Sequence, residues 1–277
     1  MPELPEVETM RRGLLPAVGA RLLSATRPPC ERRPIQIRPE IKRLDGDLRG
    51  RQITGLGRRG KRVLFHFDDG QVLAIEPRMT GIVMLADPPT REHLRLRLEL
   101  SGVSVPEVLF WDRRGLGTVT LYQADGFEQQ INARLGPDAL EITGEALKQR
   151  LGNSRRPVKP ALLDQQAVAG IGNLYAAEIL FLSKIDPRLR CNRVSMPKWR
   201  RIAAATHEVL KLAIEHEGST LSDGTYRNVL NDPGGFQNYH RVYDREGQTC
   251  RVCRSGIIRR IVQTQRSTFF CPVCQRR

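Results

Sequence analysis

The chain of 277 residues exceeds the usual size of one domain, and its 45 Lys and Arg outnumber its 30 Asp and Glu. This length predicts two domains, or three if one is a small module. The net charge of +15 indicates a polyanion partner, most often nucleic acid, although a merely basic surface gives the same count. No stretch reaches the ~20 apolar residues of a membrane span, and no signal-peptide core is present, so we expect a cytoplasmic protein without a membrane partner.

The opening segment, MPELPEVE, places three carboxylates and two prolines at the start of this basic chain. Removal of the initiator Met would leave Pro2 with a secondary amine. An α-amino group titrates near pH ~8, so a fraction is unprotonated at neutral pH and can attack an aldehyde-like carbon to form an imine. Glu3 and Glu6 could move protons for that amine. The same residues also fit an ordinary helix start, with Pro and acidic side chains in the first turn.

Short apolar runs after this helix predict an antiparallel β-sandwich or flattened barrel over residues 1–130. In the stretch from Leu94 to Leu100, Leu alternates with Arg95, Arg97 and Glu99, which predicts a strand with one buried face. The other expected strands are residues 21–26, 52–56, 63–67, 72–75, 82–85, 108–111 and 118–122.

Helical patterns replace the strands after Leu135-Gly136-Pro137 and define a second domain over residues 131–240. We expect Asn173 to cap one of these helices. Residues 218–240 contain many Gly and Asn turn residues and predict a long loop, a kind of segment that is usually functional or disordered. The other helices are expected at residues 145–151 and 159–165, and from Ser195 to a stop at Gly218.

Two cysteine pairs, Cys250-x-x-Cys253 and Cys271-x-x-Cys274, lie 17 residues apart near the C-terminus. This spacing is typical of a tetrahedral zinc site with four thiolate ligands and no open position, so the metal should be structural. We therefore predict one Zn²⁺ that folds a ribbon over residues 241–277, a module too small to fold alone. Two disulfides are the alternative, which the absence of an export signal disfavours. The remaining cysteines, expected to be structural, are Cys30 and Cys191.

Several basic or apolar residues next to glycines are candidates for nucleic-acid contacts. Backbone N–H groups after Gly170-Ile171-Gly172 could bind a phosphate, with Lys159 and Arg155 nearby. Arg266 lies in the expected tip of the ribbon, residues 264–267, from which it could reach a phosphate. Met79 could be an apolar wedge that holds a base stack open. Each of these residues also fits a solvated or partly packed surface position, as does Lys61 at the start of a strand.

Together these motifs resemble the formamidopyrimidine-DNA glycosylase family, which also contains endonuclease VIII. The similarity covers essentially the whole chain, and Leu4 favours the formamidopyrimidine branch. The shared motifs are MPELPEVET at the start, RRGKRV around Lys61, RMTG around Met79, LGPDAL at 135–140, AGIGNLYAAEILF at 169–181 and QRSTFFCPVCQ at 265–275.

The resemblance implies an α+β multidomain enzyme of DNA base-excision repair that acts as a monomer on double-stranded DNA containing an oxidised base. An N-terminal helix and β-sandwich (1–130) would be followed by a helix–two-turn–helix domain (131–240) and a zinc ribbon (241–277). The loop 218–240 would fold over the everted base. The enzyme would excise 8-oxoguanine and formamidopyrimidines and then cleave the strand by β,δ-elimination.

The resemblance also implies individual roles. Pro2 would be the nucleophile on the sugar C1′, Glu3 the acid that assists ring opening, and Glu6 its support. Lys61 would be the proton donor of β-elimination, and Arg266 would serve δ-elimination and the nearby phosphate. The DNA-contacting candidates are Met79, Arg91, His93, Arg114, Leu116, Arg155, Lys159, Asn173 and Gln265.

The sequence departs from the family in the turn after Asp112. Family members carry a wedge of Met, Arg and Phe, the last two in a DPRRFG turn. Without a gap, Arg114 keeps the wedge Arg, Gly115 replaces a second Arg and Leu116 replaces the Phe. A gap would shift the Arg by one position, and the opposite-base preference stays open.

Two other functions remain as alternatives. The first is a glycosylase of the endonuclease VIII type for oxidised pyrimidines, against which Leu4 and the long loop argue. The second is a non-enzymatic zinc-ribbon DNA-binding protein, which would not need Pro2, Glu3 and Lys61 together.

Overall fold

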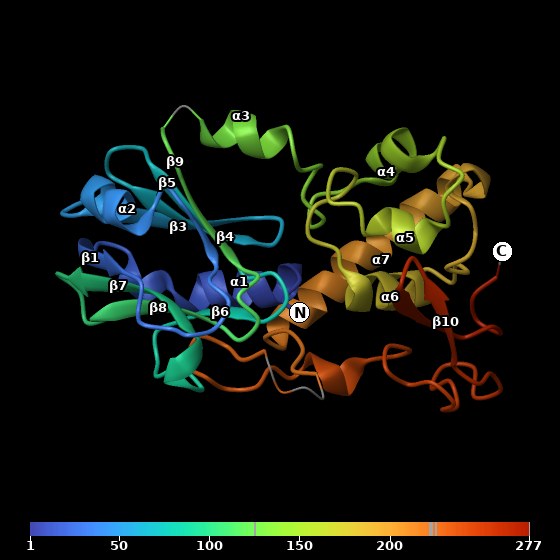
Figure 1. Ribbon diagram of the computed structural model, residues 1–277. Coiled ribbons are helices and arrows are strands. Elements are labelled where there is room, and N and C mark those ends of the chain that lie inside the picture. Colours follow the sequence, from blue (N-terminus) through green and yellow to red (C-terminus); the bar gives the residue numbers. More distant parts are fainter. Residues whose placement is uncertain (125, 222–223, 225, 277) are drawn as a thin grey trace. The chain divides into compact units, whose positions relative to one another are not determined.

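The computed structural model describes residues 1–124, 126–221, 224 and 226–276, and it shows two compact units (Figure 1). The first unit combines Met1–Ala133 with His216–Gly235. The second combines Arg134–Glu215 with Phe236–Arg277. Among the described residues, no helix is both long and apolar enough to cross a membrane.

Two β-sheets and the helix α1 (Leu4–Gly13) build the first unit (Figure 1). One sheet has the strand order β1-β7-β8-β6 and the other β2-β9-β5-β4-β3. Both sheets and α1 share one core, in which Val7, Met10, Phe65 and Leu98 are at most 1% exposed. The strands are β1 (Arg21–Thr26), β2 (Gln36–Arg38), β3 (Ile53–Arg59), β4 (Arg62–Phe67), β5 (Val72–Glu76), β6 (Gly81–Met84), β7 (Leu94–Ser101), β8 (Glu107–Asp112) and β9 (Thr118–Tyr122), and the other helices are α2 (Ile41–Leu48) and α3 (Phe127–Asn132).

The expected organisation of helix, sandwich, helical region and ribbon is confirmed, but the sandwich is not purely antiparallel. Strand β2 pairs with β9 in parallel, from Gln36 opposite Thr118 to Arg38 opposite Thr120. The sequence did not predict β2 or α2, because β2 has only three residues at the edge of the sheet and follows a Pro- and Arg-rich segment without alternation.

The alternation expected in β7 fails at Arg95. The pairing of β7 with β8 shifts between Leu94 and Leu96, and Arg95 is only 2% exposed. Such a bulge places two residues opposite one and re-aims a side chain, so Arg95 points inward although its neighbours in sequence suggest an exposed position.

The second unit consists of helices and one hairpin. The helices are α4 (Gly144–Leu151), α5 (Val158–Leu162), α6 (Asn173–Leu182) and α7 (Met196–Glu215), and the strands are β10 (Arg259–Gln263) and β11 (Arg266–Phe270). Two details differ from expectation. Gly172, not Asn173, is the N-cap of α6. The hairpin tip is only Thr264–Gln265, both with positive φ, and Arg266 already pairs with Gln263 in the sheet.

A buried carboxylate attaches the start of the ribbon to α6. Glu178 is 0% exposed and accepts hydrogen bonds from the backbone N–H groups of Arg241, Val242 and Tyr243 at 2.8–2.9 Å. Burial raises the pKa of Glu178, and the three donors oppose that rise. These bonds fix the segment that leads into the ribbon on the helix.

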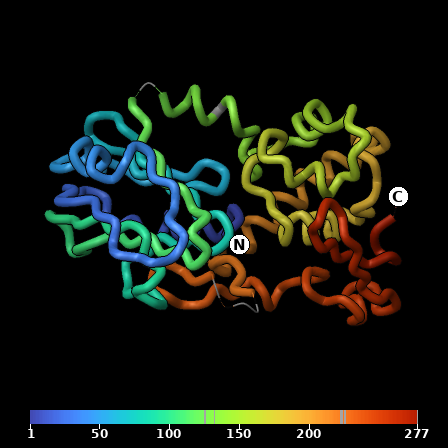
Figure 2. Tube along the Cα trace, viewed as in Figure 1, coloured from blue at the N-terminus to red at the C-terminus, as the bar shows by residue number. Residues whose placement is uncertain are grey.

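Residues 216–235 belong to the first unit, where Figure 2 shows them in orange beside the N-terminal strands. The backbone N–H of Leu85 donates to Val229 O at 3.0 Å, and Tyr226 and Val229 enter the core of the sandwich. Residues 222, 223 and 225 of the expected loop 218–240 lie outside the described residues.

Candidate functional site

The N-terminal turn of α1 is buried although it carries two acids. Pro2 is buried, and Glu3 and Glu6 are each 3% exposed. Glu6 Oε2 accepts the backbone N–H of Glu3 at 2.8 Å, and Glu6 Oε1 accepts that of Ser219 at 2.9 Å. One carboxylate therefore fixes both the residue after Pro2 and the 216–235 segment, and the expected grouping of Pro2, Glu3 and Glu6 is observed.

The segment around Ser219 fits closely against Glu6. Gly218 has a φ of +76°, and a Cβ there would lie 2.7 Å from Glu6 Oε1. Tyr226 is 3% exposed and its hydroxyl donates to Glu217 O at 3.0 Å. Burial, with the nearby charge of Glu6, raises the pKa of Tyr226 well above its usual value, so this hydroxyl stays a neutral donor.

Lys61 occupies the Gly60–Lys61 turn between β3 and β4, just before the strand it was expected to open. The Arg58 side chain ties this turn to α1, because its Nη1 donates to Gly60 O at 2.9 Å and its Nε to Glu8 Oε2 at 3.2 Å. Burial would raise the pKa of Glu8, but hydrogen bonds from Arg11 and Arg12 and the charge of Arg58 hold it below its usual value. Glu8 is therefore the charged anchor of the Lys61 turn.

Asp112 joins the two candidate wedge turns. Its side chain is 0% exposed, accepts the Thr80 hydroxyl, and accepts the backbone N–H groups of Leu116 and Gly117, both at 2.8 Å. The N–H of Arg114 donates to Thr80 Oγ1 at 3.0 Å. The loop with Met79, which is 37% exposed, is thereby attached to the turn with exposed Arg114 and half-buried Leu116.

Gly115, which stands where the resemblance places a second Arg, is explained by close packing of the backbone. Gly115 has a φ of +61°, and a Cβ there would lie 2.2 Å from Arg33 O. A residue with a long side chain could not occupy this position without moving the backbone.

The two other candidates of the first unit differ in exposure. Arg91 is exposed. His93 is 9% exposed, contacts Trp111 edge-to-face with ring centroids 5.6 Å apart, and has Nε2 3.0 Å from Glu92 Oε1. Burial lowers the pKa of His93, which favours the neutral ring.

In the second unit the structure brings Lys159, Asn173 and the hairpin together. Lys159 is 1% exposed, and its Nζ donates to Asn173 Oδ1 at 2.6 Å and to Ser267 O and Thr268 Oγ1, both at 2.8 Å. The ammonium group therefore orients Asn173 and the first residues of β11. The exposed candidates of this unit are Arg155, Gln265 and Arg266.

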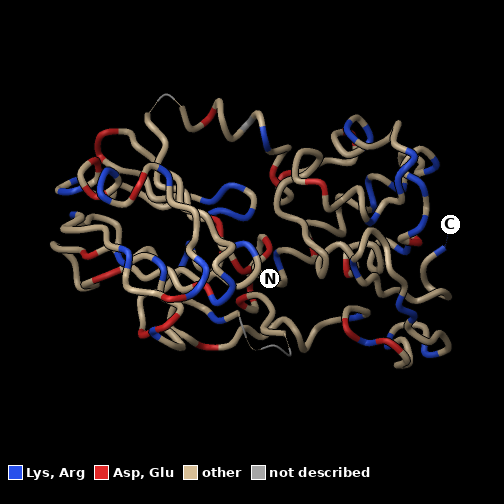
Figure 3. The backbone as a smooth tube through the Cα atoms, viewed as in Figure 1, with Lys and Arg blue, Asp and Glu red and all other residues tan. Residues whose placement is uncertain are grey.

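Sequence reasoning missed the buried acids Glu8, Asp112 and Glu178, which hold these turns. Of these, Glu178 stands in an apolar run, and an acid in such a run is a signal that its carboxylate has internal donors. Figure 3 shows that Lys and Arg are spread over both units, with acids between them, so total charge alone marks no single site.

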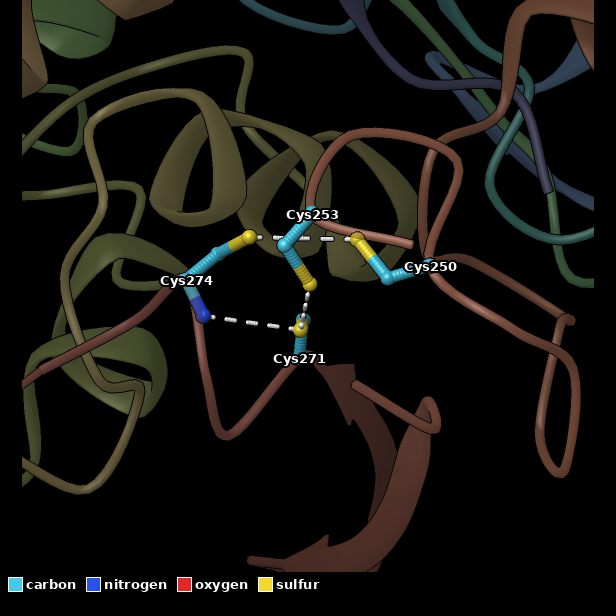
Figure 4. A group of neighbouring side chains, drawn as sticks. All are labelled: Cys250, Cys253, Cys271 and Cys274. Atoms are coloured by element: carbon cyan, nitrogen blue, oxygen red, sulfur yellow. Dashed lines mark hydrogen bonds between the residues drawn. The ribbon is translucent and has the colours of Figure 1, made fainter. Parts of the chain in front are cut away.

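The four C-terminal cysteines point toward one another (Figure 4) and their sulfur atoms all lie within 4.8 Å. Cys250 and Cys274 Sγ are 3.8 Å apart, and Cys253 and Cys271 Sγ are 3.7 Å apart. Zn–S bonds of ≈ 2.3 Å in a tetrahedron place sulfurs about 3.8 Å apart, whereas a disulfide requires about 2.05 Å. The geometry fits zinc and contradicts the disulfide alternative.

Backbone donors complete this centre. The N–H of Gly256 donates to Cys253 Sγ at 3.2 Å, and that of Cys274 to Cys271 Sγ at 3.5 Å. Backbone hydrogen bonds lower the pKa of Cys253 to about 6, whereas burial raises the pKa of Cys271 and Cys274, so the positive charge of the metal has to stabilise those two thiolates.

Comparison with known proteins places the chain in a family. Its residues 1–119 match the formamidopyrimidine-DNA glycosylase N-terminal domain, 135–225 the H2TH domain of the same enzyme, and 247–277 the zinc finger found in FPG and IleRS. The chain belongs to the formamidopyrimidine-DNA glycosylase family. With the geometry above, the zinc-finger match assigns one structural Zn²⁺ to the four cysteines.

Relatives of this family match over full length. A formamidopyrimidine-DNA glycosylase of Cereibacter sphaeroides is 39% identical over 291 aligned residues that span 100% of both chains. The FPG structure of Thermus thermophilus is 37% identical with a TM-score of 0.86, over 99% of this chain and 98% of that one. A Lactococcus lactis FPG mutant in complex with Fapy-dG containing DNA is 32% identical with a TM-score of 0.88, over 100% of both chains.

The contact between Gly218 and Glu6 predicts a specific loss of stability. Gly218→Ala and Gly50→Ala both place Ala at a φ near +80°, but the Gly50 position has no heavy atom within 4 Å. We expect Gly218→Ala to lower the free energy of unfolding by about 1–3 kcal/mol more than Gly50→Ala, the usual cost of overpacking. Urea unfolding of both variants measures this difference, and equal values would contradict the close fit.

The zinc centre predicts that Cys253→Ser loses the metal and DNA affinity before the sandwich unfolds. The control is Val252→Ser, because Val252 is 61% exposed and is not a ligand. Metal analysis should give one zinc per chain in the wild type and the control. Limited proteolysis should then cut residues 241–277 of the Cys253 variant while residues 1–119 stay intact. Retained zinc and full DNA affinity in that variant would contradict the assignment.

Proposed function

We propose that this protein is a bifunctional DNA glycosylase and lyase that removes oxidised purines from double-stranded DNA. The observation that carries the proposal is the buried acid pair beside Pro2, in a chain that matches the family over its full length. The Lactococcus lactis relative binds Fapy-dG containing DNA, which supports a formamidopyrimidine substrate.

Pro2 is the proposed nucleophile. While Met1 is attached, the Pro2 nitrogen is an amide and cannot react, so the active form begins at Pro2. Its amine attacks the sugar C1′, the damaged base leaves, and a cationic imine links protein and DNA. Glu3 supplies the proton that opens the sugar ring. Glu6 supports this step by holding the Glu3 backbone at 2.8 Å.

The imine then leads to strand cleavage. It withdraws electrons and acidifies the C2′ proton, so base loss and elimination follow from one covalent species. We assign Lys61 to the proton transfer of β-elimination and Arg266 to δ-elimination and the nearby phosphate. The anchor of the Lys61 turn, Arg58 on Glu8, holds that turn on the helix that begins after Pro2.

The damaged base must leave the duplex before it reaches Pro2, at a cost of a few kcal/mol. We propose that Met79, Arg114 and Leu116 fill the gap in the stack, since the Asp112 contacts hold their turns together. An apolar Leu in place of the family's Phe keeps a wedge but gives less stacking area. We propose Arg91 and His93 as neighbours of the DNA on the same unit.

The second unit is proposed to hold the phosphate backbone. Asn173 at the start of α6, exposed Arg155 and the hairpin residue Gln265 offer donors to phosphate or base edges. Lys159 acts by orienting Asn173 and β11, since its ammonium group has three protein acceptors. Phosphate contacts from both units should make affinity strongly salt-dependent.

We assign these roles to a catalytic sandwich domain at 1–130, a helix–two-turn–helix domain at 131–240 with a lesion-capping loop at 218–240, and a DNA-binding ribbon at 241–277. Residues 216–235 of the second segment pack with the sandwich. The proposed enzyme acts as a monomer in the cytoplasm. An endonuclease VIII-like preference for oxidised pyrimidines is the second candidate, and Leu4 and the long loop speak against it.

Borohydride trapping tests the imine directly. With a duplex that carries one 8-oxoguanine opposite cytosine, we expect a stable protein–DNA adduct, because borohydride reduces the imine to an amine. A tag before Pro2 should abolish the adduct, whereas Pro5→Ala, which leaves the N-terminal amine unchanged, should retain it.

Two outcomes decide between the candidates. No adduct from protein that begins at Pro2 would overturn the proposed mechanism. Faster cleavage of a dihydrouracil duplex than of the 8-oxoguanine duplex would instead assign the enzyme to oxidised pyrimidines.

A further inference from the structure

The bulge in β7 buries the guanidinium of Arg95, which does not use all of its hydrogen-bond donors within the part of the chain that the structure describes. Arg95 is 2% exposed. Its Nε donates to the backbone O of Asp112 at 2.8 Å, and its Nη1 lies 2.6 Å from Cys30 Sγ. The third nitrogen, Nη2, is buried without a hydrogen-bond partner among the described residues.

Arg95 also lacks a counter-charge. No ion pair involves it in the described part of the chain, and its two acceptors are a backbone carbonyl and a sulfur. A buried charge without an opposite partner is costly. Of the two acceptors, only the Cys30 sulfur can gain negative charge in a reaction, and the guanidinium lies where it would stabilise that charge.

Cys30 is also the thiol that a solvent oxidant can reach most readily. It is half-buried, and its Sγ donates to Glu92 O at 2.9 Å. Cys191 is 0% exposed, and burial raises its pKa to about 11, which suppresses its thiolate. The other four cysteines form the zinc centre. The expectation that Cys30 is merely structural does not account for its pairing with Arg95.

We propose that Cys30 is a site of oxidation by hydrogen peroxide, with Arg95 as the positioning residue that stabilises the negative charge of the reaction. The Cys30 sulfur attacks one peroxide oxygen, an S–O bond forms and the O–O bond breaks. The sulfur loses two electrons, and the departing oxygen takes the thiol proton and leaves as water. The product is a sulfenic acid, whose new oxygen can accept from Arg95 Nη2.

This product has no resolving cysteine in its own unit, because Cys30 is the single cysteine in residues 1–133 and 216–235. The sulfenic acid therefore persists until an external thiol reduces it. Arg95 also holds the backbone of Asp112, whose carboxylate organises the turn with Arg114 and Leu116. Cys30 is thus linked to that turn through Arg95 and Asp112.

The test uses zinc-loaded protein, hydrogen peroxide and a cyclic dione probe that labels sulfenic acids, read residue by residue by mass spectrometry. We expect labelling at Cys30 and none at Cys191. Labelling of Cys30 should be about tenfold faster in the native protein than in the urea-unfolded chain, within the range that hydrogen bonds to a charged group provide.

Arg95→Lys keeps the charge but loses the planar fork, and should slow labelling of Cys30 about tenfold. The control Arg97→Lys alters an exposed residue of the same strand and should leave the rate unchanged. Equal rates in native and unfolded wild-type protein would overturn the proposal, even if the Arg95 variant does not fold. A folded Arg95→Lys variant with the wild-type rate would also overturn it.

Discussion

The Glu6 carboxylate is the contact on which the proposed active site depends. It accepts backbone hydrogen bonds from Glu3, which is close to it in sequence, and from Ser219, which is 213 residues away and is brought near only by the fold. A carboxylate at 3% exposure is costly unless donors surround it. The two hydrogen bonds offset part of this cost, and they tie the residue after Pro2 to the 216–235 segment.

Buried carboxylates that accept several backbone N–H groups occur in both units. Asp112 collects the N–H groups of its turn, and Glu178 collects three N–H groups at the start of the ribbon. In each case a buried acid holds an irregular segment that has no regular backbone pairing of its own. The four thiolates and zinc do the same for the ribbon, whose described residues form two strands and part of a small apolar cluster. A few buried acidic side chains and the zinc centre thus attach the irregular segments to the regular helices and strands.

Local pattern predicted most of the elements but not these anchors. The short run of β1 and the helical spacing of α7 predicted these two elements, and the cysteine spacing predicted the zinc centre. Arg95 was placed on the wrong face because a bulge depends on the partner strand, which the alternation of one strand does not contain. The Glu6 contact with Ser219 joins distant parts of the chain, so no local window predicts it. The grouping of Pro2 with Glu3 and Glu6 was predictable because helix geometry alone brings them together.

Hydrogen exchange at the backbone amides of Glu3 and Ser219 tests the central claim most directly. In Glu6→Gln, the side chain keeps one acceptor oxygen and gains an NH₂ group, so it cannot serve both amides. We expect at least one of them to exchange roughly tenfold faster or more than in the wild type, as expected for the loss of a hydrogen bond to a charged group. The amide of Leu22, which donates to Arg51 O at 2.9 Å, should be unchanged. Wild-type protection at both Glu3 and Ser219 in the variant would contradict the account.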